Sequence, residues 1–241
     1  MGKKMKISAV ILVGGKLDND LFKKTKSSLS WVNEIVEIKT KRIPGSFAAW
    51  RNEGIKRSLG EWILYVDTDE QVSKKLHSEI VKLLKKNKVK HTAYAIPRRN
   101  FIFGKEFKHG GQRPDYQKRL FKKSALHKWV GELHEEPAFD GSLGHLKNPL
   151  IHHKHKNLFE MVEKTNEWSE IEAKLMLKAA HPKMNVFRFA SAAFREFWLR
   201  FVVQLCFLDG VKGVIYGSYQ VYSRLISYSK LWEKQLSTIR T

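Results

Sequence analysis

The hydrophobic and polar positions in the first third of the chain alternate between short apolar runs and longer segments with helical spacing. Three apolar runs have the length of strands: 7–13, 31–38 and 62–66. Three further segments are expected to be helices: 17–30, 46–59 and 73–87. Ser46 and Ser73 are suitable N-caps for the second and third. Strands that alternate with helices predict an α/β fold with a mostly parallel sheet, flanking helices and right-handed crossovers.

The later sequence changes character near residue 156. An apolar run at 93–96 predicts another strand, whereas the basic segment 97–100 and the polar segment 109–115 are expected to be loops. From Asn157 onward the spacing is helical, and glycines at 210, 213 and 217 are expected to interrupt the helices before a final one at 219–236. We therefore predict two regions, a catalytic α/β domain over 1–155 and a helical region over 156–241.

The run at 62–66 ends in a dense group of acids, Asp67, Asp69 and Glu70. Ligands of open α/β sheets bind beyond the carboxyl ends of strands. Two carboxylates one residue apart at such a place suit a divalent cation that holds a diphosphate. The same acids are equally compatible with a loop whose charges favour the N-terminus of the next helix.

The helical region contains an aromatic stripe with two interpretations. Its members follow one another at spacings of seven, four, three and four residues: Phe187, Phe194, Trp198, Phe201 and Leu205. Arg188 and Arg195 lie on another face, and residues 182–241 hold nine Lys and Arg against three Asp and Glu. The stripe either packs in a core or lies in an anionic membrane interface.

The composition favours an anionic partner. The formal charge is +21, which fits nucleic acid, an acidic membrane face or a phosphorylated substrate. A single cysteine, Cys206, excludes a disulfide within the chain and fits a reducing compartment. The most apolar run, 201–208, is far short of the ~20 residues that span a bilayer. With no secretory signal apparent, we expect a cytoplasmic protein, peripheral on the cytoplasmic face of the membrane.

Ionisable residues beside aromatics and glycines suggest further chemistry. Glutamates flank His134 close to Trp129, a setting in which a buried carboxylate can act as a general base. Arginines between aromatics and glycines suit the clamping of phosphate: Arg98, Arg99, Arg113 and Arg119. His152 and His155 lack a paired Cys-x-x-Cys, which disfavours structural zinc. His152 either joins Asp69 on a divalent ion or caps a strand end on a basic surface.

Several motifs occur together in one order. They are Arg51-Asn52-Glu53-Gly54, Gly60-Glu61-Trp62-Ile63-Leu64, Asp67-Thr68-Asp69-Glu70, Pro97-Arg98-Arg99-Asn100, Arg113-Pro114-Asp115, Arg119-Leu120-Phe121, Trp129-Val130-Gly131-Glu132-Leu133-His134-Glu135, and His152 ahead of Leu158. This ordered set, within residues 31–233, resembles family 2 glycosyltransferases. It is most similar to the lipopolysaccharide-core β-glucosyltransferase type.

The resemblance implies a GT-A fold, a Rossmann-like, mostly parallel sheet with flanking helices. It also implies inverting transfer of a sugar from a nucleotide-diphosphate donor to a lipid-linked or cell-envelope glycan. Asp69, helped by Asp67 and His152, would hold Mg²⁺ or Mn²⁺, and Glu135 would be the base, with Glu132 in reserve. The donor and acceptor residues implied are Arg51, Asn52, Asp67, Arg98, Arg113, Asp115, Arg119 and His134.

The sequence departs from this family near the N-terminus. Gly14-Gly15-Lys16 and residues 38–41 stand where the family has an Asn-Glu pair and an Asp-rich turn. Those groups commonly contact the base and ribose, so the donor nucleotide stays open. Two other hypotheses remain, an inactive membrane-associated scaffold with the same fold and a basic nucleic-acid-binding protein. As an enzyme, the protein is expected to bind an anionic membrane surface and no nucleic acid.

Overall fold

A computed structural model describes residues 6–15, 17–85, 89–131 and 135–238, which divide into two compact units. The first unit comprises residues up to Arg99 and Pro114–His152, and the second comprises Asn100–Arg113 and the chain from His153 onward. The domain boundary expected at residue 155 lies close to the break at 152. The segment 100–113, expected in the first domain, clusters with the second unit.

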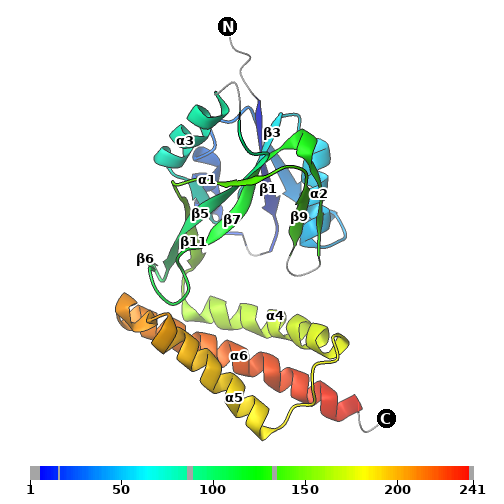
Figure 1. Ribbon diagram of the computed structural model, residues 1–241, viewed down its shortest axis with the longest axis vertical. Helices are drawn as coiled ribbons and strands as arrows, with labels where there is room; N and C mark the ends of the chain where they lie inside the picture. Colours follow the sequence, from blue (N-terminus) through cyan, green and yellow to red (C-terminus); the bar gives the residue numbers. More distant parts are fainter. Residues whose placement is uncertain (1–5, 16, 86–88, 132–134, 239–241) are drawn as a thin grey trace. The chain divides into compact units, whose positions relative to one another are not determined.

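The first unit is built on one sheet whose strands follow the order β2-β1-β3-β7-β5-β11-β4, with β10 beside β5. Figure 1 labels β1, β3, β5, β7 and β11 of this sheet. The bounds are β1 Ile7–Val13, β2 Glu34–Lys39, β3 Trp62–Tyr65, β4 Glu70–Val72, β5 Ala93–Ile102, β7 Tyr116–Lys122, β10 Leu143–His145 and β11 Leu150–His155. Strand β1 pairs in parallel with β2 and β3, whereas β7 is antiparallel to β3 and β5, and β11 is antiparallel to β4.

The α/β fold with flanking helices is confirmed, but the sheet is mixed rather than mostly parallel. Parallel strands need long crossovers, and helices supply these only in the first part of the chain. After the helix that ends at Leu84, the described part of the chain contains no α-helix until Leu158. Most strands between these helices pair in antiparallel fashion, and an exception is β10, which is parallel to β5.

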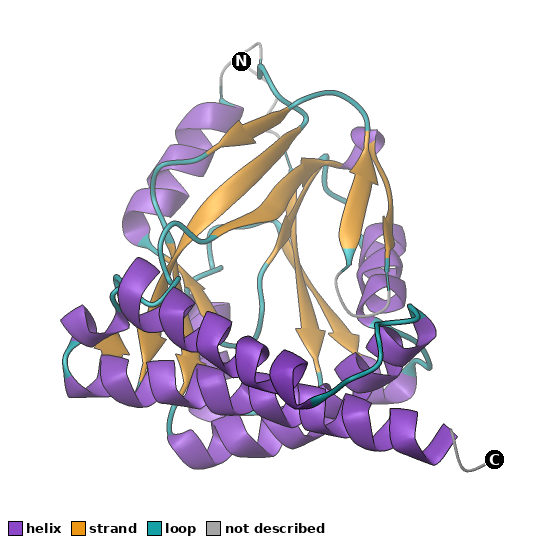
Figure 2. Ribbon diagram, turned by 60° about the horizontal axis from the view of Figure 1, so that its bottom comes forward, coloured by secondary structure: helices purple, strands orange, loops and turns teal. Residues whose placement is uncertain are grey.

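Three helices cover the sheet of the first unit: α1 Asn19–Ser27, α2 Phe47–Arg57 and α3 Lys74–Leu84. Their N-termini are capped as the residue types favour, because Ser46 and Ser73 each accept a backbone N–H of the following turn. Figure 2 shows helices on either side of the strands. Both helix starts predicted from the sequence are therefore confirmed.

The central strand β3 is buried on both faces, as its continuous apolar run predicts. Trp62 and Leu64 belong to the core cluster that contains the α3 residues, whereas Ile63 and Tyr65 belong to the cluster that contains Ala48 of α2. Alternate side chains of one strand thus serve two cores. This double burial fixes the strand's carboxyl end, where the acids begin.

One segment expected to be a loop, 97–100, belongs to a strand, and the acid run leads into another strand. Strand β5 continues through 97–100 to Ile102, and Arg98 N–H donates to the carbonyl of Asp115 at 2.8 Å. The acid run also starts a short strand, β4, which pairs with β11. Sequence periodicity misses both because β4 is only three residues long and because Pro97 and two arginines interrupt the apolar pattern of β5.

A separate hairpin lies beside α2. It consists of β8 Leu126–Val130 and β9 Glu136–Phe139, and a 3₁₀ turn over Lys123–Ala125 leads into it. Asn52 of α2 clamps the hairpin through both atoms of its amide, because its Nδ2 donates to the Trp129 carbonyl at 3.0 Å and its Oδ1 accepts from Trp129 N–H at 2.7 Å. This clamp holds the chain that leads to Glu135 against α2.

The second unit is mainly helical. Its elements are β6 Lys105–Glu106, α4 Leu158–Lys178, α5 Val186–Phe197, a π-helical segment over Trp198–Val203, a 3₁₀ turn over Cys206–Asp209 and α6 Val211–Thr238. Helix α6 packs against both α4 and α5 (Figure 1). In the described residues no helix is both long and apolar enough to cross a membrane.

The last helix starts earlier than the sequence predicts. Gly213 and Gly217 lie inside α6 rather than before it. A Cβ atom on Gly213 would lie 1.9 Å from the carbonyl oxygen of Cys206, and one on Gly217 would lie 2.5 Å from the Cys206 sulfur. The glycines therefore permit close packing of the 3₁₀ turn on the helix.

Candidate active site

Arg51 stands at the centre of the candidate site on the inner face of α2. Ala48, Arg51 and Gly54 are the buried positions of this helix, at the i, i+3 spacing of one face. A Cβ on Gly54 would lie 2.5 Å from Val10, so this glycine lets α2 approach β1 closely. The helix thus brings Arg51 to the edge of the sheet at the end of β3.

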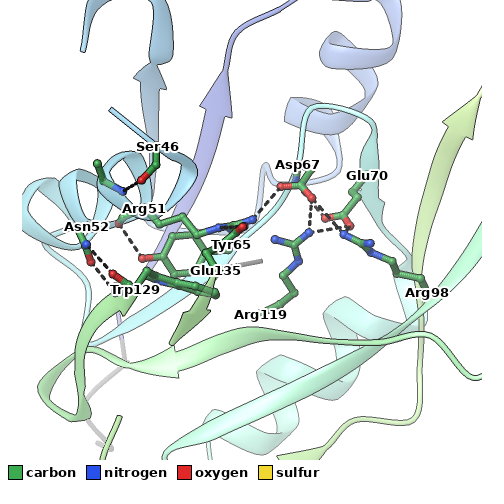
Figure 3. A network of polar contacts seen from close by, with 11 residues as sticks. Ser46, Arg51, Asn52, Tyr65, Asp67, Glu70, Arg98, Arg119, Trp129 and Glu135 are labelled. Carbon is green, nitrogen blue, oxygen red and sulfur yellow. Dashed lines mark hydrogen bonds and ion pairs between the residues drawn. The ribbon is translucent and has the colours of Figure 1, made fainter. Parts of the chain in front are cut away.

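The Arg51 guanidinium is held between two aromatic rings and two carboxylates. It lies 4.7 Å from the ring centre of Trp129 and 5.3 Å from that of Tyr65, both within cation–π range. Its Nε donates to Glu135 at 3.0 Å, and its Nη2 lies 3.7 Å from Asp67 (Figure 3). Arg51 therefore links the glutamate predicted to be the base to the first acid after β3.

Two more arginines converge on Asp67. Arg119 of β7 donates to its carboxylate, and Arg98 of β5 lies 3.1 Å from it (Figure 3). Strand order explains the meeting, because β3, β7 and β5 are consecutive neighbours in the sheet. The sequence predicted all three arginines as ligand-binding residues, and the structure brings them together around one acid.

Glu70 holds Arg98 and Arg119 in place from the interior of the protein. Its side chain is fully buried, and one carboxylate oxygen lies 2.5 Å from Arg98 and 3.2 Å from Arg119. The other oxygen accepts the backbone N–H of Asp67 at 2.9 Å. A buried carboxylate that receives three donors fixes both arginines and the turn after β3.

The charges of this network shift the ionisation of its members. Burial disfavours the charged form of Asp67, but Arg119, Arg51 and Arg98 outweigh burial and hold the pKa of Asp67 well below its usual range. Burial likewise lowers the pKa of Arg119, but Asp67 and Glu70 overcome this and raise its pKa above the ordinary value. Both groups therefore stay charged at neutral pH.

Some polar atoms of the network have no protein partner. Among the described residues, Arg98 Nε, Arg119 Nε and Trp129 Nε1 are buried and make no hydrogen bond. Buried N–H groups are nearly always satisfied in native proteins. Two of these donors, Arg98 Nε and Arg119 Nε, belong to the arginines that hold the acidic turn, which is consistent with a place where an anionic ligand accepts hydrogen bonds.

Asp69 and His152 form a second pair nearby. The register of two strands brings Asp69 and His152 together, because β11 runs antiparallel to β4 with His152 opposite Glu70. His152 Nε2 then lies 3.6 Å from the Asp69 carboxylate. Tertiary pairing thus joins two residues that lie far apart in the sequence.

This pair fits a divalent cation in part. A carboxylate and an imidazole are both used by Mn²⁺, and Mg²⁺ accepts few protein ligands when substrate phosphates supply the rest. Within the described chain, no third His, Cys, Asp or Glu joins them in one cluster. Asp67, predicted as a ligand of the same ion, instead faces its three arginines.

Glu135 borders a small cavity of about 110 Å³ that Arg51, Arg119 and Trp129 also line. Ligand pockets usually measure about 300–1,000 Å³, so only one reacting portion of a large substrate fits inside. Larger hollows of about 390 Å³ on α1 and 690 Å³ beside α5 and α6 contain none of the predicted site residues.

The remaining predicted site residues lie outside this network or outside the residues that the structure describes. Asn52 clamps the hairpin, and the Asp115 carboxylate accepts from Gln117 at 2.7 Å. Arg113 belongs to the second unit, where it pairs with Glu106. Glu132 and His134 lie outside the described residues.

Sequence reasoning missed three contributors. Glu70 was noted among the acids but was not assigned to the site, and the two rings around Arg51, Tyr65 and Trp129, were not assigned either. The available signal for Glu70 was its position two residues before Val72, which gives the alternation of a half-buried strand. For Tyr65, a polar hydroxyl at the end of an otherwise apolar run was a sign, and it donates to the Arg51 carbonyl at 3.0 Å.

Residues 25–139 match the family described as Glycosyl transferase family 2. The chain is also similar to two curated proteins, each named an uncharacterized glycosyltransferase, from Rickettsia conorii and Rickettsia felis. Each is 24% identical over 193 residues, which cover 75% of this chain and 67% of the relative.

Similarity to solved structures is low. A crystal structure of S. aureus TarS has a TM-score of 0.41 at 11% identity, covering 95% of this chain and 88% of that one. A complex of TarS with UDP-GlcNAc has a TM-score of 0.39 at 11% identity, covering 97% of this chain and 92% of the other. At these scores the structures carry no conclusion about this site.

Proposed function

We propose the donor, chemistry and acceptor of this protein, which is a glycosyltransferase because its residues 25–139 match the family described as Glycosyl transferase family 2 and two curated relatives are named glycosyltransferases. The donor is a nucleotide-diphosphate sugar, and transfer inverts the anomeric centre. The acceptor is a lipid-linked or cell-envelope glycan, as in the lipopolysaccharide-core β-glucosyltransferase type that the motifs resemble. The mixed sheet with helices on both faces is the GT-A arrangement expected of such an enzyme.

One observation carries the proposal: three arginines converge on the turn after β3, and two of them, Arg98 and Arg119, keep an Nε–H without a hydrogen bond. Asp67 and Glu70 place Arg98 and Arg119, and the free Nε–H groups of these arginines remain for a ligand. Guanidinium groups bind phosphate oxygens with charge-assisted hydrogen bonds. A diphosphate bound here would lie within the reach of Asp69 and His152.

Asp69 and His152 are the residues that would hold Mg²⁺ or Mn²⁺, with Asp67 beside them. When bound, the ion would neutralise charge that builds on the leaving diphosphate. The protein's own arginines bind and orient the same group. Asp67 then acts chiefly by positioning the arginines, a role that its contacts with Arg51 and Arg98 support.

Glu135 is proposed as the general base. Arg51 fixes its carboxylate at 3.0 Å, next to the cavity that Arg119 and Trp129 line. In the reaction the acceptor hydroxyl oxygen attacks the anomeric carbon, Glu135 accepts the hydroxyl proton, and the nucleotide diphosphate leaves with the bonding electrons. Arg51 also contacts Asp67, so the base and the donor end of the site share one support.

Donor binding can be tested by thermal shift with UDP-, GDP-, ADP- and dTDP-sugars, each with Mn²⁺ and with a chelator. A ligand that binds only the native state raises the melting temperature. We expect one nucleotide to raise it in Mn²⁺, and we expect chelation to remove most of the shift. No shift with any nucleotide would contradict the donor assignment and favour an inactive scaffold.

Two variants test the metal-binding role of Asp69 and the general-base role of Glu135 separately. Asp69→Asn should lose the metal-dependent part of the shift, while Asp20→Asn, an exposed acid on α1, should keep it. Glu135→Gln should keep donor binding and lose transfer to an acceptor glycan by about 10²-fold or more. Transfer retained in Glu135→Gln would assign the base to another residue.

A further inference from the structure

Helix α5 turns an apolar face away from the rest of its unit. Phe187 and Phe194 of α5, and Trp198 at the start of the π-helical segment that continues it, follow at spacings of seven and four residues, which places them on one face. They are 86%, 62% and 50% exposed. The buried positions of the helix, Ala192 and Glu196, lie on the other side.

Packing inside the unit does not cover this face. Helix α5 packs on α6 through its buried side, and Glu196 there pairs with Arg200 at 2.7 Å and with Arg224 of α6 at 3.5 Å. The inner side of α5 thus buries Glu196 and packs Phe189 against Trp232, with 5.8 Å between the ring centres. The face that carries Phe187, Phe194 and Trp198 stays exposed, whereas the apolar stripe of an ordinary surface helix faces the core.

Exposed apolar side chains also continue along the chain after α5. They include Val202, Val203, Phe207, Leu208 and Val211. Contiguous exposed apolar surface on a folded protein marks an interaction site more often than chance. The charge around this surface indicates which kind of partner it binds.

The edge of this face is basic. Arg188 and Arg195 each follow one of the aromatics by one residue, are seven residues apart, and are exposed. Of the three acids after residue 182, Glu196 and Asp209 are 7% and 4% exposed. Glu233 is then the one exposed acid in the described chain from 182 to 238.

We propose that the outward face of α5 docks on an anionic lipid membrane, with Phe187, Phe194 and Trp198 in the interface and Arg188 and Arg195 on lipid phosphates. Aromatic and basic residues on one helix are the chemistry that holds an in-plane helix at a bilayer surface. A second copy of the chain fits less well, because a symmetric contact would bring the arginines of both copies together without exposed acids to pair with them.

This inference deepens the proposed function, since a lipid-linked acceptor is confined to a membrane. It names the partner surface and the residues that meet it. Its test uses no sugar donor, so a failure of membrane binding and a failure of donor binding are seen in separate experiments.

The test is co-sedimentation of the full chain with vesicles of phosphatidylcholine, alone or mixed with phosphatidylglycerol. We expect pelleting with the anionic vesicles, weaker pelleting with the neutral ones, and release by salt. Phe194→Gln with Trp198→Gln should lower the partition coefficient about tenfold or more, as should Arg188→Gln with Arg195→Gln. Both pairs are exposed, so the variants should fold, which circular dichroism would verify.

Two controls test for nonspecific hydrophobic binding and for binding that depends only on net charge. Phe159→Gln removes an aromatic that is 77% exposed on α4, and Lys82→Gln with Lys85→Gln removes two exposed charges from the end of α3. Both should pellet as the unchanged chain does. The proposal is overturned if these controls lose as much binding as the α5 variants, or if the unchanged chain stays in the supernatant. A dimer in sedimentation velocity that the α5 variants dissociate would assign the face to a second copy.

Discussion

At the scale of single residues, the site depends on buried charges that balance one another. Glu70 is fully buried and serves two arginines and a backbone amide, whereas Asp67 serves three arginines and keeps one side open. Removing one partner of a buried pair leaves an uncompensated charge, which costs more than losing a pair at the surface. The two acids should therefore differ sharply from surface carboxylates on mutation.

Glu70→Gln should lower the free energy of unfolding by about 3 kcal/mol, because Arg98 and Arg119 would lose a buried counter-charge. Urea denaturation measures the change. The matched control is Glu53→Gln, which breaks the exposed pair with Arg57 at 2.7 Å and should cost about 1 kcal/mol or less. Equal small losses in the two variants would mean that the arginines do not depend on Glu70.

At the scale of elements, close packing decides where the last helix begins. Gly213 disfavours a helix by propensity, since glycine costs about 1 kcal/mol relative to alanine. In the structure it lies inside α6 because the carbonyl of Cys206 occupies the space of its missing side chain. Packing against the 3₁₀ turn outweighs the propensity.

Gly213→Ala should therefore destabilise the protein by about 2 kcal/mol, although alanine is the better helix former. The added methyl would lie 1.9 Å from the Cys206 carbonyl oxygen and would push the turn away. The shift in urea midpoint measures the loss. Ser218→Ala, an exposed position on the same helix, should change stability by less than about 0.5 kcal/mol, and a stabilised Gly213→Ala would refute the packing argument.

At the scale of the whole molecule, buried tyrosines set its alkaline limit. Burial raises the pKa of Tyr216 in the second unit to about 12, and Gln112 donates to its hydroxyl at 2.7 Å. Burial also raises the pKa of Tyr65 in the first unit. In the unfolded chain a tyrosine loses its proton near pH 10, so the unfolded state binds fewer protons above that pH and stability falls.

Stability should thus be complete below about pH 10 and should decline up to about pH 12, with Tyr216 accounting for about 2 to 3 kcal/mol of the decline. Tyr216→Phe should flatten the decline by that amount in urea denaturations at stepped pH. Tyr222→Phe, an exposed tyrosine of α6, should leave the profile unchanged. A Tyr216→Phe profile as steep as the original would contradict burial of this hydroxyl.

The sequence by itself determined the parts that depend on local pattern. The double burial of β3 and the caps Ser46 and Ser73 follow from residue type and spacing, and each is confirmed. The ordered motifs also pointed to the family whose description matches residues 25–139. Local physics suffices there because each feature is decided within a few residues.

Only the tertiary structure decided what depends on pairing between distant segments. The meeting of Asp69 with His152 follows from the β4–β11 register, and β4 is too short to be recognised from periodicity. Arg51, Arg98 and Arg119 reach one acid because their elements are neighbours in the fold, an order that no local pattern specifies. Of the aromatic stripe, Phe187, Phe194 and Trp198 are exposed because the other face of α5 packs on α6, whereas Phe201 lies beside Gly217 of α6. Periodicity alone cannot say which face of a helix is covered.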